Sequence, residues 1–164
     1  MTIKNRSLVI ALTLIVMASA ASTAIAQEKA VQLSLLAPIQ LFSQNTSIAG
    51  FRFNLLYGKN ASVSGLDWGL VNHTTTGMSH GIQSGLVSIA DADFSGGQYG
   101  FVDIVRGNLE GMQWGFVNSA HHVHGFQFGV VNYAATMKGL QVGLINIIKS
   151  GGQFPVFPII NWSF

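Results

Sequence analysis

The sequence predicts an all-β protein folded as a β-solenoid, with about seven coils of 14–16 residues and terminal capping strands. Three observations predict this fold class. A unit of the form Gly-x-Gln-x-Gly-x-x-Asn recurs along the chain, most clearly at 125–132. The first residues of the units, which we call the anchor glycines, stand at the evenly spaced positions 50, 65, 81, 96, 111, 125 and 139. Large and small side chains alternate within each unit with a period of two, as in a β-strand.

Residues 1–26 have the three parts of a secretory signal peptide. Lys4 and Arg6 give a basic start, 8–17 is an apolar run, and a small-residue cleavage site ends at Ala26. The apolar run is too short for a membrane-spanning helix, which needs about 20 residues. We therefore expect an exported protein, located at the cell surface, in the outer membrane or in the periplasm.

Charge and composition exclude several classes of function. Loss of Lys4 and Arg6 with the signal peptide leaves six basic residues against six acidic ones, so the predicted mature chain has no net charge. A nucleic-acid-binding protein needs a clustered basic surface, which this chain lacks, so we expect no nucleic-acid partner. The chain has no cysteine, so it forms neither disulfides nor thiolate metal sites.

The predicted mature chain, 27–164, is organised as a single β-repeat domain. Residues 27–49 hold a first strand that leads into the fold, with Pro38 at an edge or bend because proline cannot donate to a central ladder. The seven repeats occupy 50–150. Residues 151–164 contain two of the three prolines and are expected to cap the C-terminal end.

The alternation assigns two faces to each predicted strand. Large apolar side chains such as Phe126 and Phe128 are expected to point inward and form the core, together with the tryptophans of the repeat. The glycine-rich face around Gly129 is expected to point outward, to leave a shallow groove and to tolerate a bulky substitution. Stacked amides are expected to form hydrogen-bonded ladders along the axis. The asparagine ladder at one corner comprises Asn72, Asn118, Asn132 and Asn146, and the glutamine ladder on the outer face comprises Gln113, Gln127 and Gln141.

An eight-stranded outer-membrane β-barrel is the alternative architecture. The chain length suits such a barrel, and the alternation of Ile160, Trp162 and Phe164 resembles the C-terminal signal of these proteins. In a barrel, however, neighbouring strands run in opposite directions, so nothing requires the same unit in every strand. A parallel stack gives every coil the same neighbours, so the one-coil repeat favours the solenoid.

The repeated unit and the closing Phe-Pro-Ile-Ile-Asn-Trp-Ser-Phe resemble those of an uncharacterised family of bacterial surface-repeat proteins. The resemblance covers about 50–164. Three units depart from the motif, because Asn54 replaces a glycine, Ser84 a large residue and Gly97 an apolar one. Membership of this family implies a location on the surface or in the envelope, and it implies no catalytic residues.

His121, His122 and His124 form the only local group of candidate metal ligands, and imidazoles at this spacing could share a zinc, copper or nickel ion. An exposed polar turn is the favoured interpretation of the same residues. Ser79 and His80 are adjacent but lack the third orienting group of a catalytic triad. Glycines that recur in every unit do not form a phosphate loop. We therefore predict no catalytic residues, no metal site and no cofactor.

These observations favour a non-enzymatic protein of the cell envelope or surface that acts as a structural or interaction scaffold for an unknown protein or envelope partner. One alternative is a small outer-membrane barrel with a transport, lipid-related or enzymatic role. A second alternative is a periplasmic metal-binding protein that uses the three histidines.

The secreted protein should begin at Gln27, because signal peptides are cleaved after small residues that follow the apolar run. Mass spectrometry of the purified secreted form tests this expectation directly. A measured mass that includes Met1 would contradict the prediction of a cleaved signal peptide.

Overall fold

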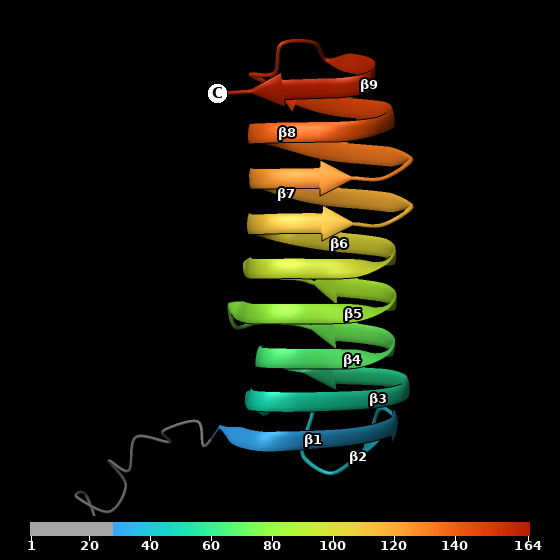
Figure 1. Ribbon diagram of the computed structural model, residues 1–164. Coiled ribbons are helices and arrows are strands. Elements are labelled where there is room, and N and C mark those ends of the chain that lie inside the picture. Colours follow the sequence, from blue (N-terminus) through green and yellow to red (C-terminus); the bar gives the residue numbers. More distant parts are fainter. Residues whose placement is uncertain (1–27) are drawn as a thin grey trace, which may run out of the picture.

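The computed structural model describes residues 28–164, and the predicted signal peptide and Gln27 lie outside them. The described chain is an all-β solenoid of about eight coils that rise along one axis (Figure 1). Its strands are β1 (Lys29–Leu36), β2 (Ile39–Gln40), β3 (Ile48–Asn60), β4 (Val63–Thr74), β5 (Ser79–Ala90), β6 (Phe94–Trp114), β7 (Val117–Phe128), β8 (Val131–Ser150) and β9 (Val156–Ser163). The predicted fold class is therefore confirmed.

Successive coils pair in parallel within one sheet of order β2-β1-β3-β4-β5-β6-β7-β8-β9. Equivalent residues of the repeat lie beside each other, so that Gly125 pairs with Gly111 on one side and with Gly139 on the other. Neighbouring strands of the alternative architecture would run antiparallel, so that alternative is wrong.

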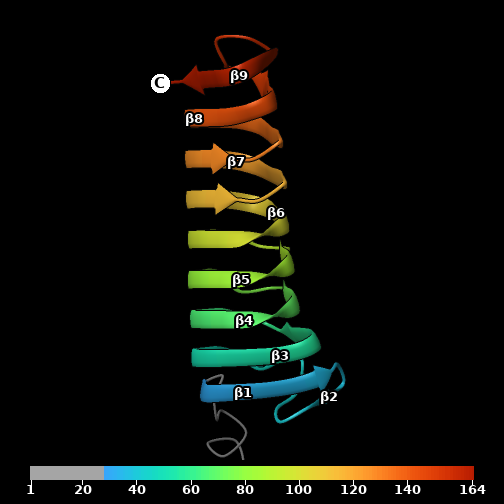
Figure 2. The same ribbon diagram turned by 45° about the vertical axis from the view of Figure 1, so that its right-hand side comes forward.

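The two ends of the stack are capped by antiparallel strands. At the N-terminal end the chain turns at Pro38, and β2 folds back on β1. At the C-terminal end β9 lies antiparallel on β8 (Figure 2). These caps cover strand edges that would otherwise be free to pair with another chain.

The anchor glycines turn tight corners in the chain. Their φ angles lie between 109° and 146°, a region that only glycine adopts readily. Space adds a second constraint, because a Cβ atom on Gly125 would meet the carbonyl oxygen of Gly111 in the coil below. Both constraints act in every coil, which explains why glycine recurs at this position.

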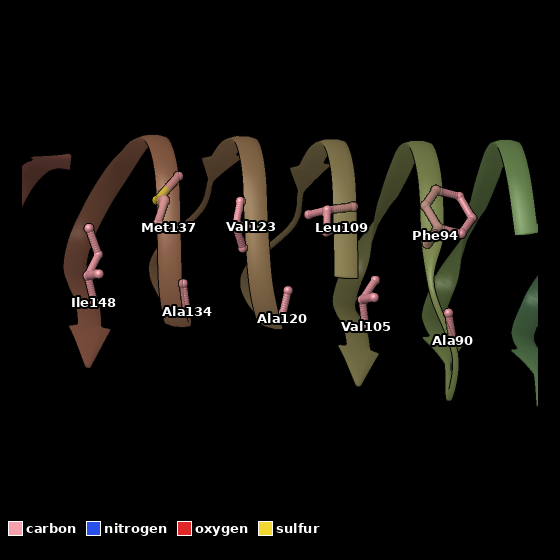
Figure 3. Close-up of a cluster of buried hydrophobic side chains, with 9 residues drawn as sticks. All are labelled: Ala90, Phe94, Val105, Leu109, Ala120, Val123, Ala134, Met137 and Ile148. Carbon is pink, nitrogen blue, oxygen red and sulfur yellow. The ribbon is translucent and has the colours of Figure 1, made fainter. Parts of the chain in front are cut away.

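Two narrow rows of apolar side chains fill part of the interior. One row comprises Phe94, Leu109, Val123 and Met137, and the other comprises Ala90, Val105, Ala120, Ala134 and Ile148 (Figure 3). Both rows run along the axis, so each side chain packs on its equivalents in the coils above and below. Burial of this surface stabilises the stack by about 25 cal/mol for each Å² removed from water.

The expectation that the large apolar face forms the core is wrong. Gln127 and the equivalent glutamines are fully buried, whereas Trp68 and Trp114 are 58% and 55% exposed. The glutamine ladder therefore lies inside the stack and not on its outer face, and the large apolar residues cover the outside.

A shift at the corner explains the inverted assignment. Gln127 is buried and Phe128 is exposed, but Val130 and Val131 are both partly exposed before Asn132 is buried again. The alternation thus slips by one residue at the corner, and Gln127 and Asn132 share the interior. An unbroken period of two had placed Asn132 on the same face as Phe128.

Gly129 faces the interior in this arrangement, so the expectation that it tolerates a bulky side chain is also wrong. A Cβ atom there would meet the carbonyl oxygen of Gly115 and the side-chain amide of Asn118. A tryptophan at this position has no room, because the coils are in contact at the glycine backbone.

Replacement of an anchor glycine should destabilise the fold more than replacement of an unstacked glycine. Gly151 also has a positive φ, 76°, but a Cβ atom there would meet nothing within 4 Å. Gly151→Ala and Gly125→Ala both carry the cost of positive φ, about 1–2 kcal/mol. Only Gly125→Ala adds a clash, which should cost about 1–3 kcal/mol more. Denaturant unfolding measures both losses, and equal losses would contradict the close stack at Gly125.

Candidate functional site

The buried glutamines form a continuous hydrogen-bonded ladder along the axis. Gln141 Nε2 donates to Gln127 Oε1 at 2.7 Å, and Gln127 Nε2 donates to Gln113 Oε1 at 2.7 Å. The ladder continues from Gln113 to Gln98 at 2.8 Å and from Gln98 to Gln83 at 2.7 Å. Every amide donates toward the N-terminal end, so each bond polarises the next and strengthens it.

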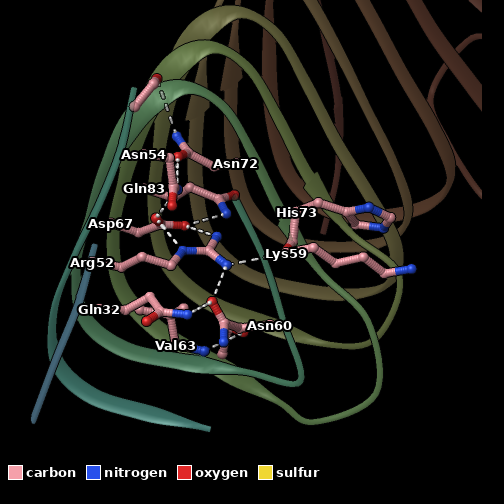
Figure 4. A network of polar contacts seen from close by, with 12 residues as sticks. Gln32, Arg52, Asn54, Lys59, Asn60, Val63, Asp67, Asn72, His73 and Gln83 are labelled. Carbon is pink, nitrogen blue, oxygen red and sulfur yellow. Dashed lines mark hydrogen bonds and ion pairs between the residues drawn. The ribbon is translucent and has the colours of Figure 1, made fainter. Parts of the chain in front are cut away.

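The glutamine ladder ends on a buried ion pair. Gln83 Nε2 donates to Asp67 Oδ2 at 2.7 Å, and Arg52 donates to both oxygens of Asp67, at 2.7 and 2.6 Å (Figure 4). Arg52 also donates to Asn60 Oδ1 at 3.2 Å and to the His73 carbonyl at 3.0 Å. Arg52 and Asp67 are closed off from solvent. This network therefore compensates its own charges inside the N-terminal coils and presents no group to a substrate.

The buried asparagines form a second ladder beside the Gly129 corner. Asn118 Nδ2 donates to Asn132 Oδ1 at 2.8 Å, and Asn132 Nδ2 donates to Asn146 Oδ1 at 2.7 Å. The same two nitrogens also donate to the backbone carbonyls of Phe128, at 2.9 Å, and Val142, at 3.0 Å. Each of these asparagines therefore ties two coils together and satisfies a carbonyl at the corner.

The asparagine ladder is interrupted between Asn72 and Asn118, where Ser88 and Asp103 take the equivalent positions. Asn72 Oδ1 accepts a hydrogen bond from Asn54 Nδ2 at 2.7 Å. Beyond this bond, Ser88 Oγ, both carboxyl oxygens of Asp103 and Asn118 Oδ1 are buried without hydrogen-bond partners. The interruption thus collects acceptor oxygens, and in place of the amide donors of the ladder it has the Ser88 hydroxyl.

Protonation of Asp103 adds a second donor to this segment. Burial raises the pKa of Asp103 from 3.8 to about 7, and the nearby Ser88 hydroxyl and Gly100 backbone offset only part of this rise. A protonated carboxyl has one O–H donor and one acceptor oxygen, so it resembles the asparagines above and below it. Asp103 is therefore suited to the ladder in its neutral form.

The three histidines considered as metal ligands lie on β7, and their side chains are exposed. The rings of His121 and His122 meet edge-on with their centroids 4.4 Å apart, and His122 Nδ1 lies 2.6 Å from Thr136 Oγ1. His124 lies beyond the buried Val123. Within 28–164, no three His, Cys, Asp or Glu side chains are grouped closely enough to hold a metal ion.

A polar chain on the outer edge was not predicted from the sequence. The Tyr57 hydroxyl lies 2.8 Å from His73 Nδ1, His73 Nε2 lies 2.9 Å from Asp91 Oδ2, and Arg106 pairs with Asp91 at 2.9 Å. Asp91 and Arg106 stand at equivalent positions of neighbouring coils, but Tyr57 and His73 do not, so no single spacing indicated the whole series. Burial and the charge of Asp91 raise the pKa of Tyr57, so its hydroxyl stays protonated and is a poor nucleophile. This series of side-chain contacts links successive coils to one another.

The outside of the solenoid carries many large apolar side chains, and we call this surface the outer wall. Its large exposed side chains include Leu66, Trp68, Leu70, Ile82, Leu86, Phe101, Trp114, Phe116, Phe128, Leu144 and Ile145. Exposed charged side chains such as Glu110 and Lys138 lie instead directly before the anchor glycines. Apolar patches of more than a few hundred Å² are rare on soluble monomers and mark interaction surfaces.

A shallow groove, which we call the corner groove, runs along the outer wall and has a volume of about 590 Å³ in its C-terminal part. Its floor is the backbone of Gly100, Gly115, Gly129 and Gly143; its sides are Trp114, Phe128 and Val142 opposite Phe116, Val130 and Leu144; and Ile159 closes its end. A second hollow lies over the equivalent Gly69 and Gly85 toward the N-terminal end. A groove was expected beside Gly129, but it lies over the glycine backbone and between side chains that were assigned to the core.

No protein-family model matches the chain, and no match is found among curated proteins or solved structures. The resemblance to bacterial surface-repeat proteins therefore stays a prediction from the motif. In the described part of the chain, no helix has both the length and the apolar character needed to cross a membrane.

The stability of the fold should depend on pH through Asp103. Because its pKa is raised on folding, the contribution of Asp103 is complete below pH 3.8 and is lost as the pH rises through about 7. The full loss corresponds to about 4 kcal/mol in the free energy of unfolding. Asp103→Asn keeps a donor at all pH values, so it should remove this fall and be more stable than the wild type in mildly alkaline solution.

Chemical denaturation across this pH range measures the effect, and Glu110→Gln is the matched control. Glu110 is an exposed carboxyl in the next coil, so its substitution should leave the pH profile of the wild type unchanged. Parallel pH profiles for the wild type and Asp103→Asn would contradict the proposed protonation of Asp103.

Proposed function

We propose that this protein is a non-enzymatic, exported protein of the cell envelope that acts as a rigid scaffold and associates with an envelope membrane through its outer wall. The observation that carries the proposal is the inverted arrangement of the side chains. Amides such as Gln127 fill the interior, while large apolar residues such as Trp68 and Trp114 cover the outside.

The buried ladders support a scaffold role. Parallel backbone pairing and side-chain amide bonds connect each coil to the next, so the outward side chains form straight rows at fixed spacing. Aromatic rings in these rows are in contact, with the Phe101 and Phe116 centroids 4.8 Å apart and stacked. A surface held in this way loses little conformational freedom when it binds a partner.

The chemistry of the outer wall favours a membrane over a protein partner. Protein interfaces make about one hydrogen bond for each 100–200 Å² of buried surface. From β5 to β8 the outer wall has no charged side chain, and its hydroxyl groups are those of Ser84, Tyr99, Ser119 and Tyr133. A hydrocarbon layer needs no hydrogen-bond partners, and tryptophan and tyrosine are favoured where hydrocarbon meets water.

An enzymatic role has less support. The residues that line the C-terminal part of the corner groove, from Gly100 to Ile159, include no general acid, base or nucleophile. The buried pair of Arg52 and Asp67 is out of reach of a substrate. The histidines of β7 do not line the corner groove; His122 and His124 line a different hollow with Glu110 and Lys138.

Flotation with phospholipid vesicles tests the proposal. The mature wild type should rise with vesicles of phosphatidylethanolamine and phosphatidylglycerol. The double variant Leu66→Glu with Ile145→Glu places two charges on the outer wall, away from the residues that line the corner groove, and should remain at the bottom.

The matched control is Thr76→Glu with Ser150→Glu, which adds the same charge at exposed positions away from the outer wall. It should float like the wild type, and circular dichroism should show the same strand content for all three proteins. A wild type that stays at the bottom, or two double variants that behave alike, would overturn the membrane association.

A further inference from the structure

The corner groove has the form of a binding site for one linear apolar molecule. We propose that it binds a single unbranched hydrocarbon chain, namely the acyl chain of a lipid. The inference deepens the proposed function and rests on it, since a membrane of the envelope would supply the lipid. It differs from membrane association in that one chain occupies one defined channel.

The shape of the corner groove follows from the stack. Its floor passes from Gly100 to Gly143 across four coils, which at the spacing of paired strands is roughly 15 Å. Because three successive coils contribute the same three positions and a fourth adds Gly100, the groove is straight and runs along the axis. A straight apolar groove of this length fits an extended chain.

The N–H groups of two floor glycines are already paired within the protein. Gly115 N donates to the Phe128 carbonyl at 3.1 Å, and Gly129 N donates to the Val142 carbonyl at 3.0 Å. The asparagine ladder donates to both of these carbonyls from inside the stack. Apart from the indole of Trp114, the side chains that line the groove are apolar, so an extended peptide would find few side-chain partners for its own N–H and C=O groups, whereas a hydrocarbon chain needs none.

The sides of the corner groove are preformed. Trp114 and Phe128 are in contact with their ring centroids 5.0 Å apart, and Phe116 stacks on Phe101. The C-terminal part, about 590 Å³, lies in the range of about 300–1,000 Å³ that is usual for small-molecule sites. A chain that enters this site buries apolar surface on three sides without a rearrangement of the protein.

Ile159 gives the groove a defined end. This β-branched residue has a φ of 69°, an unfavourable backbone conformation, where β9 pairs with Gly143. Its side chain lines the corner groove and is 69% exposed. Backbone strain is typically retained at functional sites, and here it places an apolar side chain across the C-terminal end of the channel.

Calorimetric titration with octanoate, laurate and palmitate tests the site, with two neighbouring valines as a matched pair. Val130 lines the corner groove and Val131 does not, although both are partly exposed. Affinity should rise with chain length, by up to about fourfold for each added methylene group. Val130→Trp fills the channel and should weaken palmitate binding by about tenfold or more. Val131→Trp should bind palmitate like the wild type.

A second measurement does not depend on the folding of the variants. Palmitate that carries bromine on its chain should quench the fluorescence of Trp114 in the wild type, and Trp114→Phe should lose most of that quenching. Absence of palmitate binding to the wild type, affinity that is independent of chain length, or equal loss in both valine variants would each overturn the proposal. A wild-type dimer that Val130→Trp converts to a monomer would also overturn it, because a second copy would then occupy the channel.

Vesicle flotation of the same variants separates this inference from the proposed function. Val130→Trp that floats with vesicles but does not bind palmitate supports the channel as a site distinct from the outer wall. Flotation of the wild type without palmitate binding overturns the channel alone, and palmitate binding without flotation overturns the membrane association alone.

Discussion

A buried amide group without a hydrogen-bond partner costs about 1–3 kcal/mol, so the glutamines inside this stack depend on partners in the neighbouring coils. Gln127 satisfies this requirement with Gln113 on one side and Gln141 on the other. These bonds form only when neighbouring coils are parallel and in register, since a slip of one residue would turn the amide to the outside. The glutamine ladder therefore fixes the register, and the tight corners at the anchor glycines let the coils approach closely enough for it to form.

Because amide side chains occupy much of the interior of the stack, the large apolar side chains lie on its outside. The interior is narrow, and most of its volume belongs to two amide ladders and two rows of small or medium apolar side chains. The outer wall thus follows from the same repeat that builds the core. The asparagine ladder connects the interior with the outer wall, because Asn118 and Asn132 donate from inside to the carbonyls of Phe128 and Val142, whose side chains line the corner groove. The apolar groove therefore lies directly over the buried amides.

Much of the fold could be predicted from the sequence, because the spacing of the anchor glycines encodes which residues lie beside each other. The coil length, the parallel stack and the capping segments follow from it. Which face points inward could not be predicted. The alternation shifts by one residue between Phe128 and Asn132, and a period of two in the sequence gives no information about the bend that causes this shift. Contacts between different positions of neighbouring coils, such as Tyr57 with His73, were also invisible to a repeat alignment. The raised pKa of Asp103 arises from its burial. The prediction that large apolar side chains fill the core gave no sign of that burial.

The free energies of unfolding of Gln127→Leu and Phe128→Gln test the inverted core most directly, because the two residues are adjacent and face opposite ways. Gln127→Leu should lose about 1–3 kcal/mol, since it leaves Gln113 Oε1 without a donor and removes one of the two acceptors of Gln141 Nε2. Phe128→Gln should change stability by less than about 1 kcal/mol, since its side chain is on the surface. The opposite order, with a stable Gln127→Leu and an unstable Phe128→Gln, would contradict the account.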